Sequence, residues 1–82
     1  MRHFKPYANE GDVLRIGHLE IENRTDRITL AGDVVLTRDK AGLALARELQ
    51  TLLNQVVKVL EACEKLPEAV QVKPVQNVKN PF

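Results

Sequence analysis

The chain has 82 residues, of which 44% are hydrophobic and 28% are charged. This length allows one small domain, and the composition is typical of a folded globular protein rather than a disordered one. The 12 basic and 11 acidic residues are interspersed and give a net charge of +1, so the chain lacks the clustered basic surface typical of duplex DNA-binding proteins.

The sequence offers little of the chemistry that catalysis or metal binding needs. Its one cysteine, Cys63, excludes an intrachain disulfide and a cysteine-rich metal site. His3 and His18 do not have the spacing of metal ligands, and the four glycines are dispersed and form no phosphate-binding loop. We therefore expect a non-enzymatic protein without catalytic, cofactor-binding or metal-binding residues.

Residues 1–11 contain Pro6, Asn9 and Gly11 and show no hydrophobic periodicity, so we expect an irregular N-terminal arm. The arm has no apolar segment of the kind found in secretory signals. No run of eighteen apolar residues occurs in the chain, which argues against a membrane span. A cytoplasmic location is the default expectation.

Residues 12–36 alternate apolar and polar side chains in two runs, which predicts two antiparallel strands joined at residues 23–26. In the first run, Leu14 and Ile16 have even numbers, whereas the later apolar residues have odd numbers. We expect a β-bulge at Gly17–His18 to restore the buried face. A kink at Gly32 would split the second run, so a third short strand is the alternative.

Residues 37–66 form one uninterrupted helical pattern, with Thr37 as the predicted N-cap and Pro67 directly after Leu66. One stripe of this helix has apolar residues at alternating spacings of four and three, the heptad pattern of a helix–helix seam. Its members are Leu45, Leu49, Leu52, Val56, Val59, Cys63 and Leu66. Because the rest of the chain is small, we expect a second copy to cover this face, and these residues are the predicted dimer interface.

The residues beside the seam add to this expectation. Leu53, Val57 and Leu60 widen the apolar face.

Arg38 and Lys40, at the predicted start of the helix, are candidates for contact with an anion or a partner, with plain capping of the helix as the alternative.

The C-terminal segment, residues 67–82, contains three prolines that exclude a helix, with valines between them. We expect it to be either disordered or extended along a neighbouring surface.

These elements predict an α+β domain over residues 12–66 in β-β-α order, in which a bulged antiparallel β-hairpin packs on one long C-terminal helix. The favoured function is a small homodimeric module that binds another protein through its hairpin edge or its tail. The alternative is a nucleic-acid-associated accessory or regulatory protein that uses basic residues of both subunits. The salt dependence of binding distinguishes these two functions, because an affinity that comes from phosphate contacts falls steeply with ionic strength.

Overall fold

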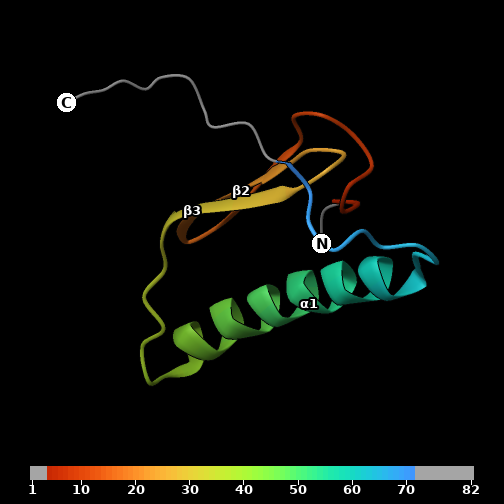
Figure 1. The fold of residues 1–82 in the computed structure, drawn as a ribbon. Coiled ribbons are helices and arrows are strands. Elements are labelled where there is room, and N and C mark those ends of the chain that lie inside the picture. The colour runs from red at the N-terminus through yellow and green to blue at the C-terminus, as the bar shows by residue number, and fades with distance from the viewer. Residues whose placement is uncertain (1–3, 72–82) are drawn as a thin grey trace.

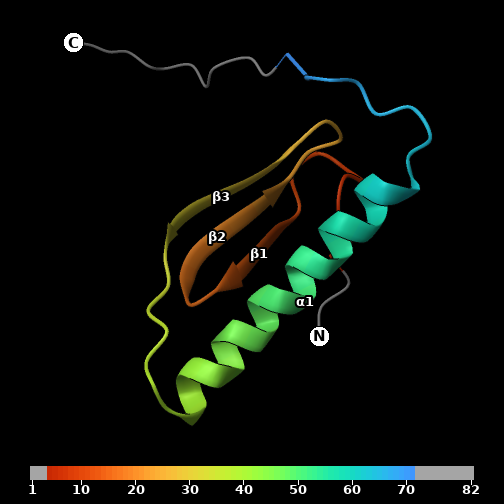
Figure 2. The same cartoon turned by 60° about the horizontal axis from the view of Figure 1, so that its bottom comes forward.

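The computed structural model describes residues 4–71, and it contains three strands followed by one long helix (Figure 1). Strands β1 (Val13–Ile16), β2 (His18–Asn23) and β3 (Ile28–Asp33) form an antiparallel sheet in the order β1-β2-β3. Helix α1 (Lys40–Ala62) lies across one face of this sheet, next to β1 (Figure 2). The α+β class is confirmed, with the order β-β-β-α in place of β-β-α.

The bulge predicted at Gly17–His18 is instead a hairpin turn, which splits the first run into β1 and β2. Ile16 pairs with Leu19 across this turn. Residues paired in a hairpin lie on the same face, and here their numbers differ by an odd number, so the buried residues change parity at the turn. Gly17 has a φ of 62° and His18 does not have a positive φ, the pattern of a type II′ turn.

The second run forms a single strand, β3, which continues through Gly32 and ends at Asp33. The split considered at Gly32 does not occur. Gly32 has a φ of 102°, and a Cβ at this position would overlap the carbonyl oxygen of His18 on β2. Glycine therefore allows the two strands to pair where a side chain would push them apart.

The buried core is small and lies between α1 and the inner face of β1 and β2. Leu14, Ile16 and Ile21 of the sheet pack with Leu52 of α1 and with Phe4 of the N-terminal arm. Among the described strands, only β1 has its backbone close to α1. The helix therefore lies nearest β1, while β3 contributes Ile28 to the packing around the core.

Residues 4–12 contain neither helix nor strand, and one buried side chain ties this segment to the end of β2. Asn23 has no exposed surface. Its side-chain nitrogen donates to the carbonyl oxygen of Lys5 at 2.8 Å, and its side-chain oxygen accepts from the backbone N–H of Tyr7 at 2.8 Å. Tyr7 has a φ of 66°, which is uncommon for a residue with a side chain, so these bonds stabilise a turn that the backbone alone disfavours. The turn carries Phe4 into the core.

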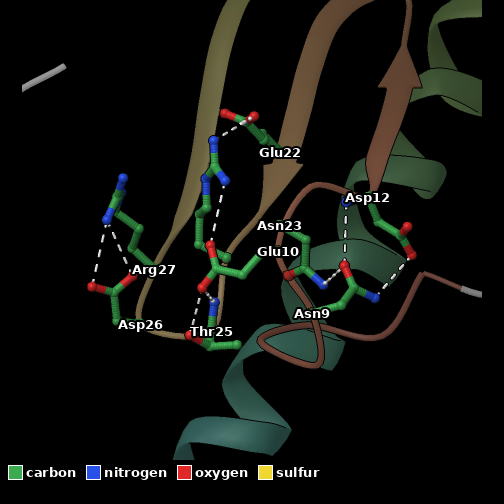
Figure 3. A network of polar contacts seen from close by, with 9 residues as sticks. Asn9, Glu10, Asp12, Glu22, Asn23, Thr25, Asp26 and Arg27 are labelled. Carbon is green, nitrogen blue, oxygen red and sulfur yellow. Dashed lines mark hydrogen bonds and ion pairs between the residues drawn. The ribbon is translucent and has the colours of Figure 1, made fainter. Parts of the chain in front are cut away.

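A second set of polar contacts joins the arm to the connection between β2 and β3 (Figure 3). The carboxylate of Glu10 accepts hydrogen bonds from the hydroxyl and the backbone N–H of Thr25, at 2.7 and 3.2 Å, and forms an ion pair with Arg24 at 3.3 Å. The pKa of Glu10 is lowered. The hydrogen bond from the hydroxyl of Thr25 has the largest effect, followed by the bond from its backbone N–H and then by Arg24. Since these groups are exposed, they orient the arm more than they stabilise it.

Helix α1 begins and ends inside the predicted range. Asp39, and not Thr37, is the N-cap: its carboxylate accepts from the N–H of Gly42 at 2.8 Å and from the hydroxyl of Thr37 at 2.6 Å. A carboxylate at this position also interacts favourably with the helix dipole, which a hydroxyl does not. The helix ends at Ala62 instead of Leu66. Pro67 explains the early end, because proline lacks an N–H and its ring clashes with the carbonyl group four residues before it.

The segment predicted to be extended or disordered, residues 67–82, has neither helix nor strand in residues 67–71. Residues 72–82 lie outside the described part of the chain. The expectation for the whole tail therefore stays a prediction.

Asn23→Ala should lower the free energy of unfolding by about 1–3 kcal/mol, because it leaves the carbonyl of Lys5 and the N–H of Tyr7 without their partner. Asn23→Asp keeps the size and the acceptor but loses the donor to Lys5, so it should also destabilise. Urea denaturation followed by circular dichroism measures both. Unchanged stability in Asn23→Ala would show that the arm is held by other contacts.

Gly42→Ala should destabilise the protein, although alanine in place of glycine normally stabilises a helix by about 1 kcal/mol. A Cβ on Gly42 would overlap the backbone of Thr37. We expect a loss of about 1–3 kcal/mol, the range typical of overpacking, in the same denaturation assay. Ala44→Gly, at an exposed position of the same helix, is the control for the difference in helix propensity between glycine and alanine. A gain in stability for Gly42→Ala would contradict the contact.

Candidate interaction surface

The predicted dimer seam is divided between the core of the subunit and its surface. Leu52 has no exposed surface. The half-buried members are Leu45, Leu49, Val56 and Val59. Cys63 and Leu66 are exposed and follow the last residue of α1. The sheet of the same chain therefore covers the middle of the seam, and a dimer interface formed by all seven residues stays a prediction.

A second stripe of α1 lies beside the first, and much of it is exposed. It repeats at spacings of three and four and consists of Leu43, Ala46, Gln50, Leu53, Val57 and Leu60, which we call the outer stripe. Leu43, Leu53 and Val57 are 52%, 45% and 50% exposed. A helix that packs only on its own sheet carries polar residues on its remaining surface. The outer stripe is therefore the part of α1 that most resembles an uncovered helix–helix contact.

The outer stripe lies on the side of α1 nearer β3. The segment 34–39 runs from the end of β3 to the start of α1 (Figure 2), and Gly42 contacts Thr37 of this segment. Gly42 therefore marks the side of the helix that faces the connection from β3. Leu53 and Leu60 follow it by eleven and eighteen residues, about three and five turns, and share that side.

A large apolar side chain of the sheet is also exposed on its inner face. Leu30 of β3 pairs with Ile21 of β2, and the two lie on the inner face of the sheet. Ile21 is fully buried under the helix, whereas Leu30 remains 44% exposed. The cause is the position of α1 over β1, which leaves Leu30 uncovered although Ile28 of the same strand packs against the core. The outer stripe is therefore the open apolar surface of α1, and Leu30 is a separate exposed apolar side chain of the sheet.

A cavity of about 330 Å³ lies where the end of α1 meets the arm and the connection between β2 and β3. Its lining consists of Tyr7, Thr25, Asp26, Val59, Leu60, Cys63, Leu66 and Val70. It brings together the last three members of the predicted seam and Leu60 of the outer stripe. The thiol of Cys63 donates to the carbonyl oxygen of Val59 at 3.4 Å. The cavity therefore extends the apolar surface beyond the end of the helix.

Arg38 and Lys40, the predicted contacts for an anion or a partner, are exposed on either side of Asp39. The hydrogen bond from Thr37, followed by that from the N–H of Gly42, lowers the pKa of Asp39, so this carboxylate is charged near neutral pH. An external anion at this helix end would meet that negative charge and an N–H that is already bonded. The geometry leaves Arg38 and Lys40 as surface cations, and their role in binding stays a prediction.

Residues 4–71 show neither a metal-binding cluster nor a membrane-spanning helix. Within this part of the chain, no three histidine, cysteine, aspartate or glutamate side chains gather as metal ligands would. The same residues contain no helix with both the length and the hydropathy needed to cross a bilayer.

Comparison with known proteins identifies no relative. No protein-family model, no curated protein and no solved structure matches the chain. The surface of the molecule is therefore the basis from which a function can be inferred. Sequence reasoning missed the outer stripe as a separate feature, although its second heptad phase is visible in the sequence beside the first.

Asp39 has a lowered pKa in the folded protein, so acid should remove the part of the folding stability that depends on its ionised carboxylate. Because folding lowers this pKa, the stabilising effect is complete above the ordinary aspartate pKa of about 3.9 and is lost as the pH falls through the folded-state value. Asp39→Asn keeps an N-cap acceptor but does not titrate. Its free energy of unfolding should fall less steeply between about pH 5 and about pH 2 than that of the unchanged protein. Urea denaturation at several pH values measures this, and equal slopes would contradict it.

Proposed function

We propose that the chain is a small, non-enzymatic homodimeric module that binds another protein. The observation that carries the proposal is the open apolar surface of the outer stripe, in which Leu43, Leu53 and Val57 are 52%, 45% and 50% exposed. Monomeric proteins rarely leave large apolar side chains grouped in this way, and such groups mark interaction sites. The size of the chain supports the same conclusion, because so small a core commonly needs oligomerisation to be stable.

A second copy of the chain is the partner that this surface fits most simply. The outer stripe has heptad spacing, and a stripe with this spacing packs best against another helix with the same spacing. The dimer contact passes through the outer stripe rather than through Leu52, because Leu52 is already enclosed by the sheet of its own subunit. The exposed end of the predicted seam, at Cys63 and Leu66, adjoins this contact.

We propose that the other protein binds at the free edge of β3. The strand order places β3 at the edge of the sheet. Residues Ile28–Asp33 contain neither proline nor lysine, the residues that commonly protect an edge strand from pairing. An extended segment of a partner can therefore add a strand here through backbone hydrogen bonds.

The nucleic-acid alternative has less support from the charged groups. Three arginines of the described residues, Arg15, Arg24 and Arg27, form ion pairs with neighbouring carboxylates. Arg38 and Lys40 flank the charged Asp39. Phosphate binding favours clustered cations without nearby carboxylates. The proposal also places the module in the cytoplasm, because Cys63 is an exposed free thiol, which a reducing compartment preserves.

Leu53→Glu together with Val57→Glu should convert the dimer into a folded monomer. Both side chains are exposed in the single subunit, so the charges stay solvated there but would be buried in a dimer. Sedimentation equilibrium should give twice 9.2 kDa for the unchanged protein and 9.2 kDa for the variant, with circular dichroism confirming the helix in both.

The matched control is Ala44→Glu together with Thr51→Glu, which adds the same charges at exposed positions away from the outer stripe. This control should remain a dimer. An unchanged protein that is monomeric, or a Leu53→Glu, Val57→Glu variant that stays dimeric, would overturn the proposed assembly. Leu52→Glu is unsuitable as a test, since it would disrupt the core of the subunit.

A further inference from the structure

We infer that the two copies of α1 pair antiparallel across the outer stripe, with Lys40 of each subunit opposite the partner's Glu61. This inference rests on the proposed homodimer and specifies its geometry. Three properties of the described residues carry it: the order of side chains along the outer stripe, the charges beside the stripe, and the position of the sheet relative to α1.

The first property is the match between the two halves of the outer stripe. When α1 is reversed on itself with nearly complete overlap, the two copies bring Leu43 opposite the partner's Leu60, Ala46 opposite the partner's Val57, and Gln50 opposite the partner's Leu53. The small Ala46 then faces the larger Val57, and every exposed apolar residue of the stripe has an apolar or amphipathic neighbour. In a parallel pair each residue would face its own copy, so that Ala46 would face Ala46 and Gln50 would face Gln50.

The second property is the charge of the row that borders the stripe on its solvent side. This row recurs every seven residues and consists of Lys40, Arg47, Asn54 and Glu61, all of them exposed. None of its three charged members forms an ion pair within the described part of the chain. Antiparallel helices place this row against the same row of the partner in reverse order, so a lysine meets a glutamate at both ends of the contact.

A parallel pair would give these charges no partner. In that arrangement the row faces the other border of the outer stripe, which consists of Gly42, Leu49, Val56 and Cys63. Leu49 and Val56 of that border pack on the core of their own subunit. The opposite signs of Lys40 and Glu61 therefore favour the antiparallel arrangement, as does the attraction between two opposed helix dipoles.

The third property is the position of the sheet. A two-fold axis that reverses α1 is perpendicular to the helix, so both sheets lie on the same side of the helix pair. Leu60 of the outer stripe lines a cavity together with Thr25 and Asp26 of the connection between β2 and β3, so the two β3 strands then lie toward each other. The inner faces that carry Leu30 are brought to the same side of the dimer. A parallel pair would place the sheets on opposite sides and leave each face of β3 separate.

Spin labels at two positions distinguish the arrangements. In a Cys63→Ser background, Thr51→Cys and Ala62→Cys place labels at exposed sites about three turns apart on one side of α1, away from the outer stripe. In the antiparallel dimer the two labels at position 51 have almost no axial offset, whereas those at position 62 are offset by about 30 Å along the helix. Double electron–electron resonance should therefore give a clearly longer distance at position 62.

Equal distances at the two positions would overturn the antiparallel pairing while leaving the homodimer intact. The absence of any distance between subunits, together with a mass of 9.2 kDa, would overturn both the pairing and the proposed function. The two failures are therefore distinguishable.

Charge reversal tests the end contacts. Lys40→Glu and Glu61→Lys should each weaken the dimer about tenfold, since each creates like charges at both ends, and the double variant should restore the affinity. Glu48→Lys, at an exposed position outside the bordering row, is the control and should leave the affinity unchanged. A double variant as weak as the single variants would show that Lys40 and the partner's Glu61 are not neighbours.

Discussion

The packing of Leu52 against β1 and β2 is the interaction on which the rest of the structure depends. Leu52 is enclosed by side chains of these two strands and by Phe4, and this contact fixes α1 over one side of the sheet. Two consequences follow from that position. Leu30 on the inner face of β3 stays exposed, and so does much of the outer stripe of α1. The open apolar surface is therefore a direct result of how the core is built.

The same contact explains why the arm and the connections matter in a chain this small. A core of few residues gains little from burial alone, and the chain has no disulfide to add to it. The arm supplies Phe4 to the core through the buried hydrogen bonds of Asn23. Gly42 allows the segment after β3 to pass close to the first turn of α1. These features close one side of the sheet, and nothing in residues 4–71 closes the other.

Particular residues show where sequence reasoning succeeded and where it could not. The alternation around Ile21 and the helical period around Leu52 correctly predicted strands, helix and class, because period two and period 3.6 arise from backbone geometry. The change of parity at Gly17 was interpreted as a bulge, but a two-residue turn produces the same pattern. The choice between them depends on which residues pair. Thr37 and Asp39 both have side chains that can cap a helix, and only the hydrogen bond from the N–H of Gly42 identifies Asp39 as the N-cap.

The sequence by itself determined that α1 carries a broad apolar face with heptad spacing and that the strands before it have one apolar side. Periodicity specifies which residues share a face, since that depends only on the local backbone. It does not specify whether the sheet of the same chain or a partner covers that face. Two heptad phases lie side by side on α1, and only the tertiary structure decided that the phase with Leu52 faces the sheet while the phase with Leu53 remains open. The reason is physical: a helix can turn only one of its faces toward the sheet, and the side chains that fill the core select which phase that is.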